Sequence, residues 1–139
     1  MMDFVLDASI ALTWCFADEA TSHTLSLLDK LQTGKAFVPC IWTLELGNIL
    51  ISAERRKRIT YADIVKFIEL ITDLNIQINS ETSDRALHEV LSLAYAEKLT
   101  TYDASYLELA MRKGLPLATK DMQLSKVANR LGVELLSGE

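Results

Sequence analysis

Short apolar runs recur along the chain, and each is bounded by polar or turn-forming residues. Runs of this length are typical of strands buried in a sheet. The tract Ile76-Gln77-Ile78 alternates apolar and polar side chains instead, as a strand with one exposed face does. We therefore expect strands at residues 3–6, 36–38, 76–78, 115–119 and 133–136.

Between these runs, apolar residues return every three or four positions, which is the period of a helix with one buried face. Leu25, Leu28 and Leu31 keep this spacing until Gly34 interrupts it. Thr60 is a suitable N-cap for the helix that follows it. We expect the buried stripe of that helix to comprise Ile64, Phe67, Ile68 and Ile71. Helices are predicted at residues 19–34, 41–58, 60–74, 82–94, 99–114 and 122–132.

The helix predicted after residue 81 has two candidate caps, Thr82 and Ser83. Its expected inward residues are Ala86, Leu87, Val90, Leu91 and Ala94. Strands that alternate with helices, through connections too long for hairpins, favour right-handed crossovers and a parallel sheet. The predicted fold class is therefore α/β, with a mainly parallel central sheet and helices on both faces in three layers, α/β/α.

The composition agrees with a single globular domain over residues 1–139, because half of the residues are hydrophobic and 24% are charged. No apolar stretch reaches membrane-spanning length. The N-terminus lacks the basic region of a signal peptide, so we expect a cytoplasmic protein without membrane contact. Cys15 and Cys40 have no metal-binding spacing and are expected to be small buried hydrophobes. His23 and His88 fall within predicted helices, as surface or packing residues.

Acidic residues gather where the predicted strands end. Asp7 directly follows the first strand, and Asp121 follows the tract "LPLAT" after one lysine. Asp103 lies where a helix starts, and we expect it to cap that helix. Glu45 lies amid apolar neighbours within a helix, with Asn48 on the same face. Each acid also has an ordinary interpretation, as a loop acid, an N-cap or a solvent-facing helical residue.

Ligands of parallel sheets bind at the carboxyl ends of the strands, so these acids are candidates for one site. Carboxylates without cysteine or paired histidine favour Mg²⁺, with Mn²⁺ as an alternative. Such a site suits phosphodiester hydrolysis, in which the metal activates water. The net charge of −5 argues against nucleic-acid binding by a broadly basic surface, but does not exclude a nuclease whose acids hold a cation.

Substrate contacts are predicted less directly. Lys120 lies beside Asp121 and could meet phosphate. Tyr102 lies beside Asp103 and could stack on a base, or could pack as a hydrophobic staple. The basic tract "AERRKR", which ends at Arg58, could also meet phosphates, but we favour a solvated helix end, where positive charge suits the helix dipole.

Four spaced motifs together resemble the PIN-domain ribonucleases of the VapC toxin family. They are Asp-Ala-Ser after the first strand, Glu-x-x-Asn in a helix, Tyr-Asp-Ala-x-Tyr at a helix start, and Thr-x-Asp after the "LPLAT" strand. The resemblance covers essentially the whole chain and implies a PIN-like fold. It also implies the toxin component of a type II toxin-antitoxin system, with metal-dependent endonucleolytic cleavage of RNA that leaves a 5′-phosphate.

The resemblance assigns roles to individual residues. Asp7 and Asp103 correspond to direct metal ligands, Glu45 to a ligand or a holder of metal-bound water, and Asp121 to a second-metal ligand or an outer acid. Ser9 and Thr119 correspond to hydroxyls that line the metal pocket, and Asn48 to a helix-face asparagine. Expected partners are an RNA substrate, a VapB-like antitoxin and a second copy of the chain.

Three other functions can be weighed against the sequence. A non-catalytic interaction module with the same fold would not need all four acidic positions filled, as they are here. A phosphatase of the haloacid dehalogenase type would normally have a second acid two residues after its nucleophile, where this chain has Ser9. A receiver domain would need an adjacent pair of acids early in the chain, and "VLDAS" contains only Asp7.

Overall fold

The central sheet of the computed structural model, which describes residues 3–136, has four strands in the order β3-β2-β1-β4. All neighbouring strands are parallel, and Phe4 pairs with Ala36 while Val5 pairs with Leu117. The strands are β1 Phe4–Leu6, β2 Ala36–Pro39, β3 Ile76–Asn79 and β4 Leu117–Ala118. The prediction of a parallel α/β sheet is confirmed.

The strand predicted at 133–136 is wrong, because this segment forms only one bridge, between Leu117 and Leu135. Two backbone bonds support the bridge, from Leu117 N to Glu134 O at 2.9 Å and from Leu136 N to Leu117 O at 3.0 Å. The partner strand β4 is only two residues long, so there is no longer edge for this segment to follow.

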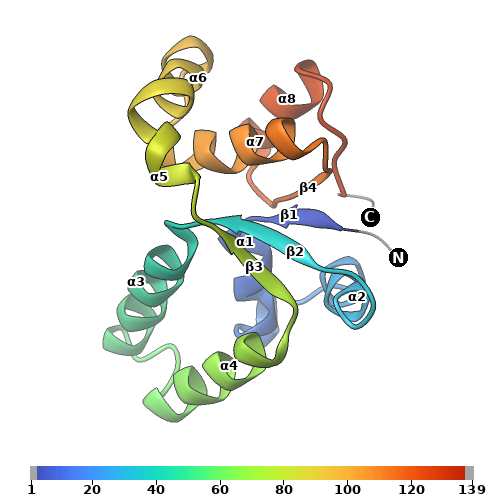
Figure 1. Ribbon diagram of the computed structural model, residues 1–139. Coiled ribbons are helices and arrows are strands. Elements are labelled where there is room, and N and C mark those ends of the chain that lie inside the picture. The colour runs from blue at the N-terminus through green and yellow to red at the C-terminus, as the bar shows by residue number, and fades with distance from the viewer. Residues whose placement is uncertain (1–2, 137–139) are drawn as a thin grey trace.

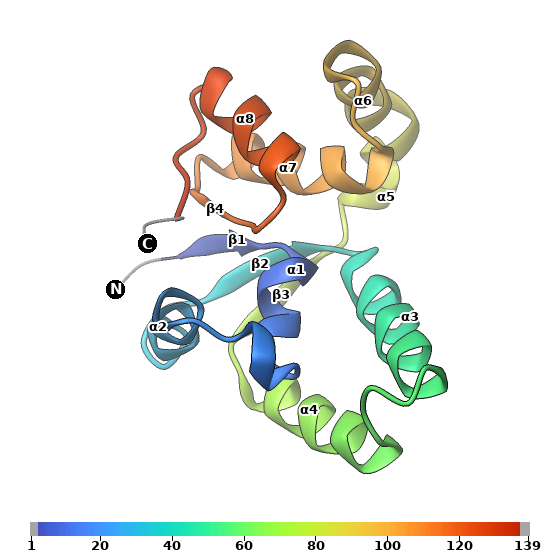
Figure 2. The same cartoon turned by 180° about the vertical axis from the view of Figure 1, so that it is seen from behind.

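Helices cover both faces of the sheet, which confirms the three-layer arrangement. In Figures 1 and 2, α1 to α4 lie on one face and α5 to α8 lie on the other. The helices are α1 Ala8–Ala11, α2 Ser22–Lys30, α3 Trp42–Arg55, α4 Tyr61–Asp73, α5 Thr82–Arg85, α6 Leu91–Glu97, α7 Thr101–Lys113 and α8 Met122–Arg130. Shorter turns are the 3₁₀ segments η1 Leu12–Trp14 and η2 Ala17–Glu19, and the π-helical turn η3 Ala86–Val90. Within residues 3–136, no helix is long and apolar enough to cross a membrane.

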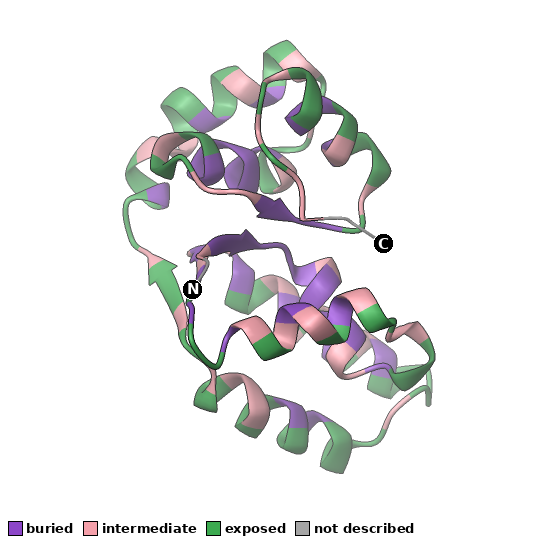
Figure 3. Cartoon of the chain, turned by 90° about the vertical axis from the view of Figure 1, so that its right-hand side faces the viewer, coloured by how far each residue is buried: buried purple, intermediate pink, exposed green. Residues whose placement is uncertain are grey.

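The core lies on both sides of β1, whose three residues are completely buried (Figure 3). Trp42 from α3 and Tyr106 from α7 are the largest fully buried side chains, one in each helical layer. Full burial of a large apolar side chain contributes roughly 1.5–3 kcal/mol. The edge strand β3 has no buried residue: Ile76 is half-buried and Ile78 is exposed, so the buried face that its alternating sequence predicts is not formed. By contrast, β1 and β4 are buried between the two helical layers.

The expected cap of the helix after residue 81 is wrong, and its expected buried face is right only in part. Neither Thr82 nor Ser83 caps it; Glu81 is the N-cap residue, and Thr82 Oγ1 is buried without a hydrogen-bond partner among residues 3–136. The π-helical turn η3 adds a residue to the turn and shifts the helical phase. Leu87 and Leu91 consequently face solvent, while Val90 and Ala94 are buried as predicted.

Other local expectations have mixed outcomes. Thr60 caps α4 in a capping box with Asp63, as its position predicts. Ile64 and Phe67 are buried, but Ile68 is exposed, because α4 packs with a narrower face than the period alone suggests. Cys15 and Cys40 are thiols that are half-buried rather than buried.

Candidate metal centre

Four carboxylates from four elements line one cavity of about 370 Å³. Asp7 follows β1, Glu45 lies in α3, Asp103 lies in α7, and Asp121 precedes α8. The cavity opens where β1 and the neighbouring β4 end, which is where ligands of parallel sheets bind. The tertiary structure thus brings together the acids that the sequence singled out.

Asp7 is the most deeply buried of the four, with 6% of its surface exposed. Ser9 Oγ and Thr119 Oγ1 both donate to its Oδ2, at 2.9 and 2.5 Å. Burial raises the pKa of Asp7, the two hydroxyl bonds oppose this rise, and the negative charge of Asp121 adds to it. Ser9 and Thr119, which were expected to line the metal pocket, therefore both contact Asp7.

The same hydroxyls connect Asp7 to the segment that carries Asp121. Thr119 Oγ1 accepts from the backbone N–H of Asp121 at 3.0 Å, and Ser9 Oγ accepts from that of Lys120 at 3.0 Å. Asp121 Oδ1 accepts from Leu124 N at 2.7 Å, so Asp121 is the N-cap of α8. It caps a helix and lines the cavity at the same time.

Asp103 does not cap its helix, contrary to expectation. Thr100 is the N-cap of α7, and its hydroxyl accepts from Asp103 N at 3.1 Å. Thr100 takes this place because its backbone is extended, whereas Asp103 already lies within the first helical turn. The half-buried carboxylate of Asp103 instead lines the cavity, where burial and then the charges of Asp121 and Asp7 raise its pKa to about 6.

Glu45 reaches the cavity from α3, which lies on the opposite face of the sheet from α7 and Asp103. The hydroxyl of Tyr106, in α7, donates to Glu45 Oε1. Burial raises the pKa of Glu45, the Tyr106 bond opposes this rise, and the charges of Asp7 and Asp103 add to it. Sequence reasoning missed Tyr106 as a contact of the site. Its spacing three residues after Asp103 in the Tyr-Asp-Ala-x-Tyr motif was the available signal.

Asn48 and Tyr102 lie outside the carboxylate cavity, in an adjoining one of about 320 Å³. Both side chains are exposed, and Glu45 lines both cavities. Asn48 therefore shares a helix face with Glu45 as predicted, but it does not line the cavity that contains the other three acids.

Two cationic side chains, Arg58 and Lys120, also line the carboxylate cavity, together with Glu19. Lys120 was predicted, whereas Arg58 was considered only as part of a basic tract and Glu19 was missed. Neither residue has a distinctive sequence motif. Their position depends on the fold of residues 14–20 against the end of α3.

The donor set fits a hard divalent cation, because the acids supply only oxygen and their mutual repulsion is relieved by positive charge. Within residues 3–136, however, no three His, Cys, Asp or Glu side chains stand at a spacing that would hold an ion. Mg²⁺ keeps several waters and needs only one or two carboxylates. The arrangement therefore suits a weakly held, water-rich ion better than an all-protein cage.

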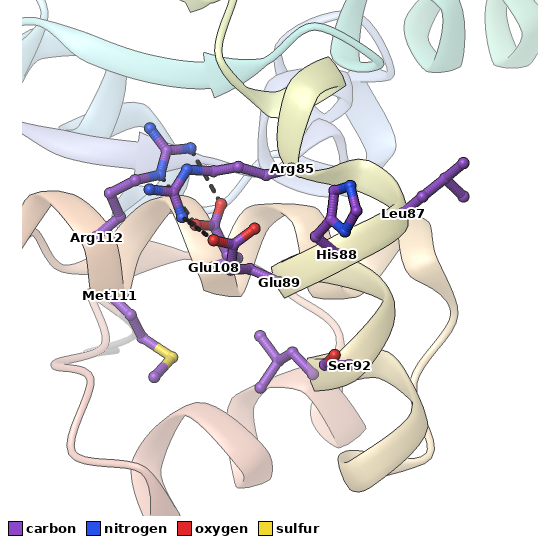
Figure 4. Close-up of a pocket in the computed structure, with 9 residues that line it drawn as sticks. Arg85, Leu87, His88, Glu89, Ser92, Glu108, Met111 and Arg112 are labelled. Atoms are coloured by element: carbon purple, nitrogen blue, oxygen red, sulfur yellow. Dashed lines mark hydrogen bonds and ion pairs between the residues drawn. The ribbon is translucent and has the colours of Figure 1, made fainter.

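A larger cavity of about 910 Å³ lies between the α5-η3-α6 segment and α7 (Figure 4). Its charged groups pair with one another: the buried Glu108 accepts from Arg85 at 3.1 Å and from both Nε and Nη2 of Arg112, at 2.9 and 3.0 Å. His88, at its rim, is exposed. Its two carboxylates, Glu89 and Glu108, are both paired with arginine, and we assign no chemistry to this cavity.

Known proteins are similar to this chain in sequence and in fold. The family model of the PIN domain matches residues 4–130. Exonuclease VapC9 from Pyrobaculum aerophilum is 33% identical over 93 residues, which cover 66% of this chain and 67% of that protein.

Solved structures show the same fold at lower identity. PAE2754 from P. aerophilum has a TM-score of 0.67 at 23% identity, covering 90% of this chain and 85% of that one. VapBC2 from Rickettsia felis, bound to a DNA fragment from its promoter, has a TM-score of 0.65 at 13% identity, covering 96% and 97%. FitAcB from Neisseria gonorrhoeae has a TM-score of 0.53 at 15% identity, covering 97% and 96%. The chain therefore belongs to the PIN-domain family and is a relative of the VapC nucleases.

Proposed function

We propose that this chain is a single-domain, Mg²⁺-dependent endoribonuclease and the toxin component of a type II toxin-antitoxin system. The observation that carries the proposal is the convergence of Asp7, Glu45, Asp103 and Asp121 on one cavity, from four separate elements. A non-catalytic module would have no reason to bear the cost of clustered, partly buried carboxylates. Family membership supports the same conclusion, because PIN nucleases generally depend on divalent metals.

In this proposal Asp7 and Asp103 hold the cation, and Glu45 and Asp121 complete the acidic site as ligands or outer acids. When bound, Mg²⁺ (or Mn²⁺) supplies Lewis-acid stabilisation of the phosphate and lowers the pKa of water. Ser9 and Thr119 fix the orientation of Asp7 through their hydroxyl bonds. Tyr106 fixes Glu45 in the same way. Such outer contacts normally determine how precisely ligands are placed.

RNA contacts are assigned to residues at the rim. Lys120 lines the carboxylate cavity and has the charge to meet a phosphate. Tyr102 is 55% exposed beside Glu45 and Asn48, so its ring is available for stacking with a base. Asn48 supplies a polar group in that adjoining cavity. Water, rather than the ribose 2′-hydroxyl, is the proposed nucleophile, so the product carries a 5′-phosphate.

The proposed partners are a VapB-like antitoxin and a second copy of the chain. The structural likeness to the VapBC2 and FitAcB assemblies supports an antitoxin. Large apolar side chains are exposed on α3 and α4 and suit an amphipathic partner helix. They are Leu44, Ile51, Tyr61, Val65 and Ile68.

The test is cleavage of single-stranded and structured RNA by the purified chain, with Mg²⁺, Mn²⁺ or chelator, beside Asp7→Asn and Asp103→Asn. We expect cleavage only with metal, and a loss of about 100-fold or more in either variant, since each removes a charged ligand. Gln77→Ala, on the exposed edge strand, is the control. Equal rates in wild type and both variants would refute the proposed site.

A second substrate is needed to distinguish endonucleolytic from exonucleolytic cleavage, because the relative in P. aerophilum is named an exonuclease. A closed circular RNA has no ends, so only an endonuclease can cut it. We expect the circle to be linearised at a rate comparable to that of a linear RNA of the same sequence. If only the linear RNA is degraded, the chain is an exonuclease that uses the same site, and the proposed endonuclease activity is refuted.

A further inference from the structure

A glutamate connects the two cations of the carboxylate cavity. Glu19 Oε2 lies 2.9 Å from Arg58 Nη2, and Glu19 Oε1 lies 3.7 Å from Lys120 Nζ. One carboxylate thus faces Arg58 with one oxygen and Lys120 with the other. All three side chains are about one-third or more exposed, so solvent and ligands can reach them.

Arg58 is held in place by contacts besides this ion pair. Its guanidinium lies 4.0 Å from the ring centroid of Phe16, which is itself buried, and Asp18 Oδ1 lies 3.0 Å from Nη2. Stacking on an aromatic ring orients the plane of a guanidinium. The side chain is therefore pre-positioned over the cavity rather than free to sample the solvent.

The backbone at Lys57, directly before Arg58, has an uncommon conformation that directs the Arg58 side chain to the carboxylate cavity. Lys57 has φ 63°, a left-handed value that costs a non-glycine residue roughly 1 kcal/mol. Arg58 N donates to Ala53 O and Lys57 N donates to Glu54 O, both at 2.9 Å, which is the Schellman pattern for a helix end. This turn folds Arg58 back towards residues 16–19, while Arg55 and Arg56 do not line the cavity.

The charge balance of the cavity makes these cations important. Five carboxylates, including Glu19, line it against two cations, so a phosphodiester would be repelled without local positive charge. Arginine and lysine are the usual partners of backbone phosphates. Glu19 supplies the oxygen acceptors that a phosphate would otherwise supply.

We propose that Arg58 and Lys120 together bind a backbone phosphate of the RNA substrate beside the cleaved bond, and that this phosphate displaces Glu19 from between them. Arg58 is then a substrate-binding residue, and Glu19 is an internal competitor that weakens RNA binding. The inference rests on the proposed nuclease function for its substrate class. It makes predictions of opposite sign for two residues that form one ion pair.

The test compares Arg58→Ala, Arg58→Lys and Glu19→Gln with wild type, using Arg56→Ala as a control with the same change in charge. In RNA cleavage with saturating Mg²⁺, we expect Arg58→Ala to raise KM about tenfold with little change in kcat, and Arg58→Lys to be intermediate. Glu19→Gln should lower KM severalfold, since it frees both cations. Arg56→Ala should match wild type. Thermal melting of each variant establishes that it is folded.

If the ion pair between Glu19 and Arg58 only stabilised the fold, removing either partner would have the same effect on KM. If Glu19→Gln raises KM as Arg58→Ala does, or if Arg58→Ala behaves like Arg56→Ala, the inference is overturned.

Fluorescence anisotropy with a labelled single-stranded RNA separates this inference from the proposed function. It is done with Mg²⁺ in an Asp103→Asn background. Binding that weakens in Arg58→Ala and tightens in Glu19→Gln supports the inference even if the wild type cleaves nothing. Binding that neither variant alters, or no RNA binding by any variant, refutes it even if RNA is cleaved at the acidic site. The slope of log affinity against log salt should fall by about 1 in Arg58→Ala.

Discussion

The hydroxyl of Tyr106 donates a hydrogen bond to Oε1 of Glu45, and this bond joins helices from opposite faces of the sheet. Tyr106 lies in α7 and is fully buried, whereas Glu45 lies in α3 and is only half-buried. Burial and the nearby Glu45 carboxylate raise the pKa of the Tyr106 hydroxyl, so it stays a proton donor. The bond thereby orients a cavity carboxylate from a rigid part of the core.

Tyr106→Phe should lower kcat for RNA cleavage by about tenfold, because an outer contact that orients a ligand typically has an effect of this size. The free energy of unfolding should fall by only about 1 kcal/mol, the usual net contribution of one hydrogen bond. Steady-state kinetics and urea unfolding measure the two effects. Tyr95→Phe is the control, since Tyr95 is 88% exposed. An unchanged kcat in Tyr106→Phe would show that Glu45 needs no such support.

The stability of the metal-free protein should fall as pH rises. Burial raises the pKa of Asp7, Glu45 and Asp103, the last to about 6, above the ordinary carboxyl range near 4. Between these values the folded chain binds more protons than the unfolded chain, so unfolding becomes easier with each step in pH. The contribution of Asp103 is fully present below about pH 4 and is lost as pH passes about 6, and the raised pKa values of Asp7 and Glu45 act in the same direction.

Melting temperatures of the metal-free protein between pH 4 and pH 8 measure this effect. Asp103→Asn should show a shallower decline, because one of the raised groups is gone. A melting temperature that rises steadily through the same window would contradict the assigned pKa directions.

Mg²⁺ should stabilise the folded chain at pH 7, because it neutralises carboxylates that repel one another. At 100 times the dissociation constant, a ligand specific for the folded state adds about 2.7 kcal/mol. For a domain of this size that corresponds to a rise of roughly 5–10 °C in melting temperature. Differential scanning fluorimetry with Mg²⁺ and with chelator measures it. The double variant Asp7→Asn, Asp103→Asn should lose the response, and a rise of equal size in that variant would place the ion elsewhere.

Glu108→Ala should destabilise the fold without acting on the carboxylate cavity. Glu108 is 7% exposed and pairs with Arg85 and Arg112, so its removal leaves two partly buried cations without their common partner. Breaking a buried ion pair in this way typically costs about 3 kcal/mol. Glu89→Ala removes the exposed partner of the same Arg85 and should cost at most about 1 kcal/mol. Chemical unfolding compares the two, and equal losses would show that burial of Glu108 is not decisive.

Local patterns were sufficient to predict the layered parallel fold and part of the site. Alternating strands and helices allow few topologies, because parallel crossovers are right-handed and strand pairing places strand ends at a common edge. The sequence therefore places Asp7 and Asp121 at one edge of the sheet. The capping box at Thr60 was equally predictable, since it involves residues only three positions apart.

The phase of residues 82–97 could be read only in part from the same patterns. A π-helical turn, which packs against α7, displaces the apolar stripe, and the spacing of apolar residues does not reveal such a turn. Leu87 is consequently exposed despite its helical spacing. In the same way, Thr100 rather than Asp103 caps α7, because the position where the chain leaves its extended conformation decides which side chain can cap.

Sequence periodicity thus determined the order of elements and the placement of acids at strand ends, since these follow from local patterns, and the rule for crossovers then favoured a parallel sheet. Only the tertiary structure brought Tyr106 to Glu45 and Arg58 to Glu19, pairs separated by 61 and 39 residues. Such contacts depend on how helices from different layers pack over the end of the sheet. That packing is a property of the whole core, and no short stretch of the chain encodes it.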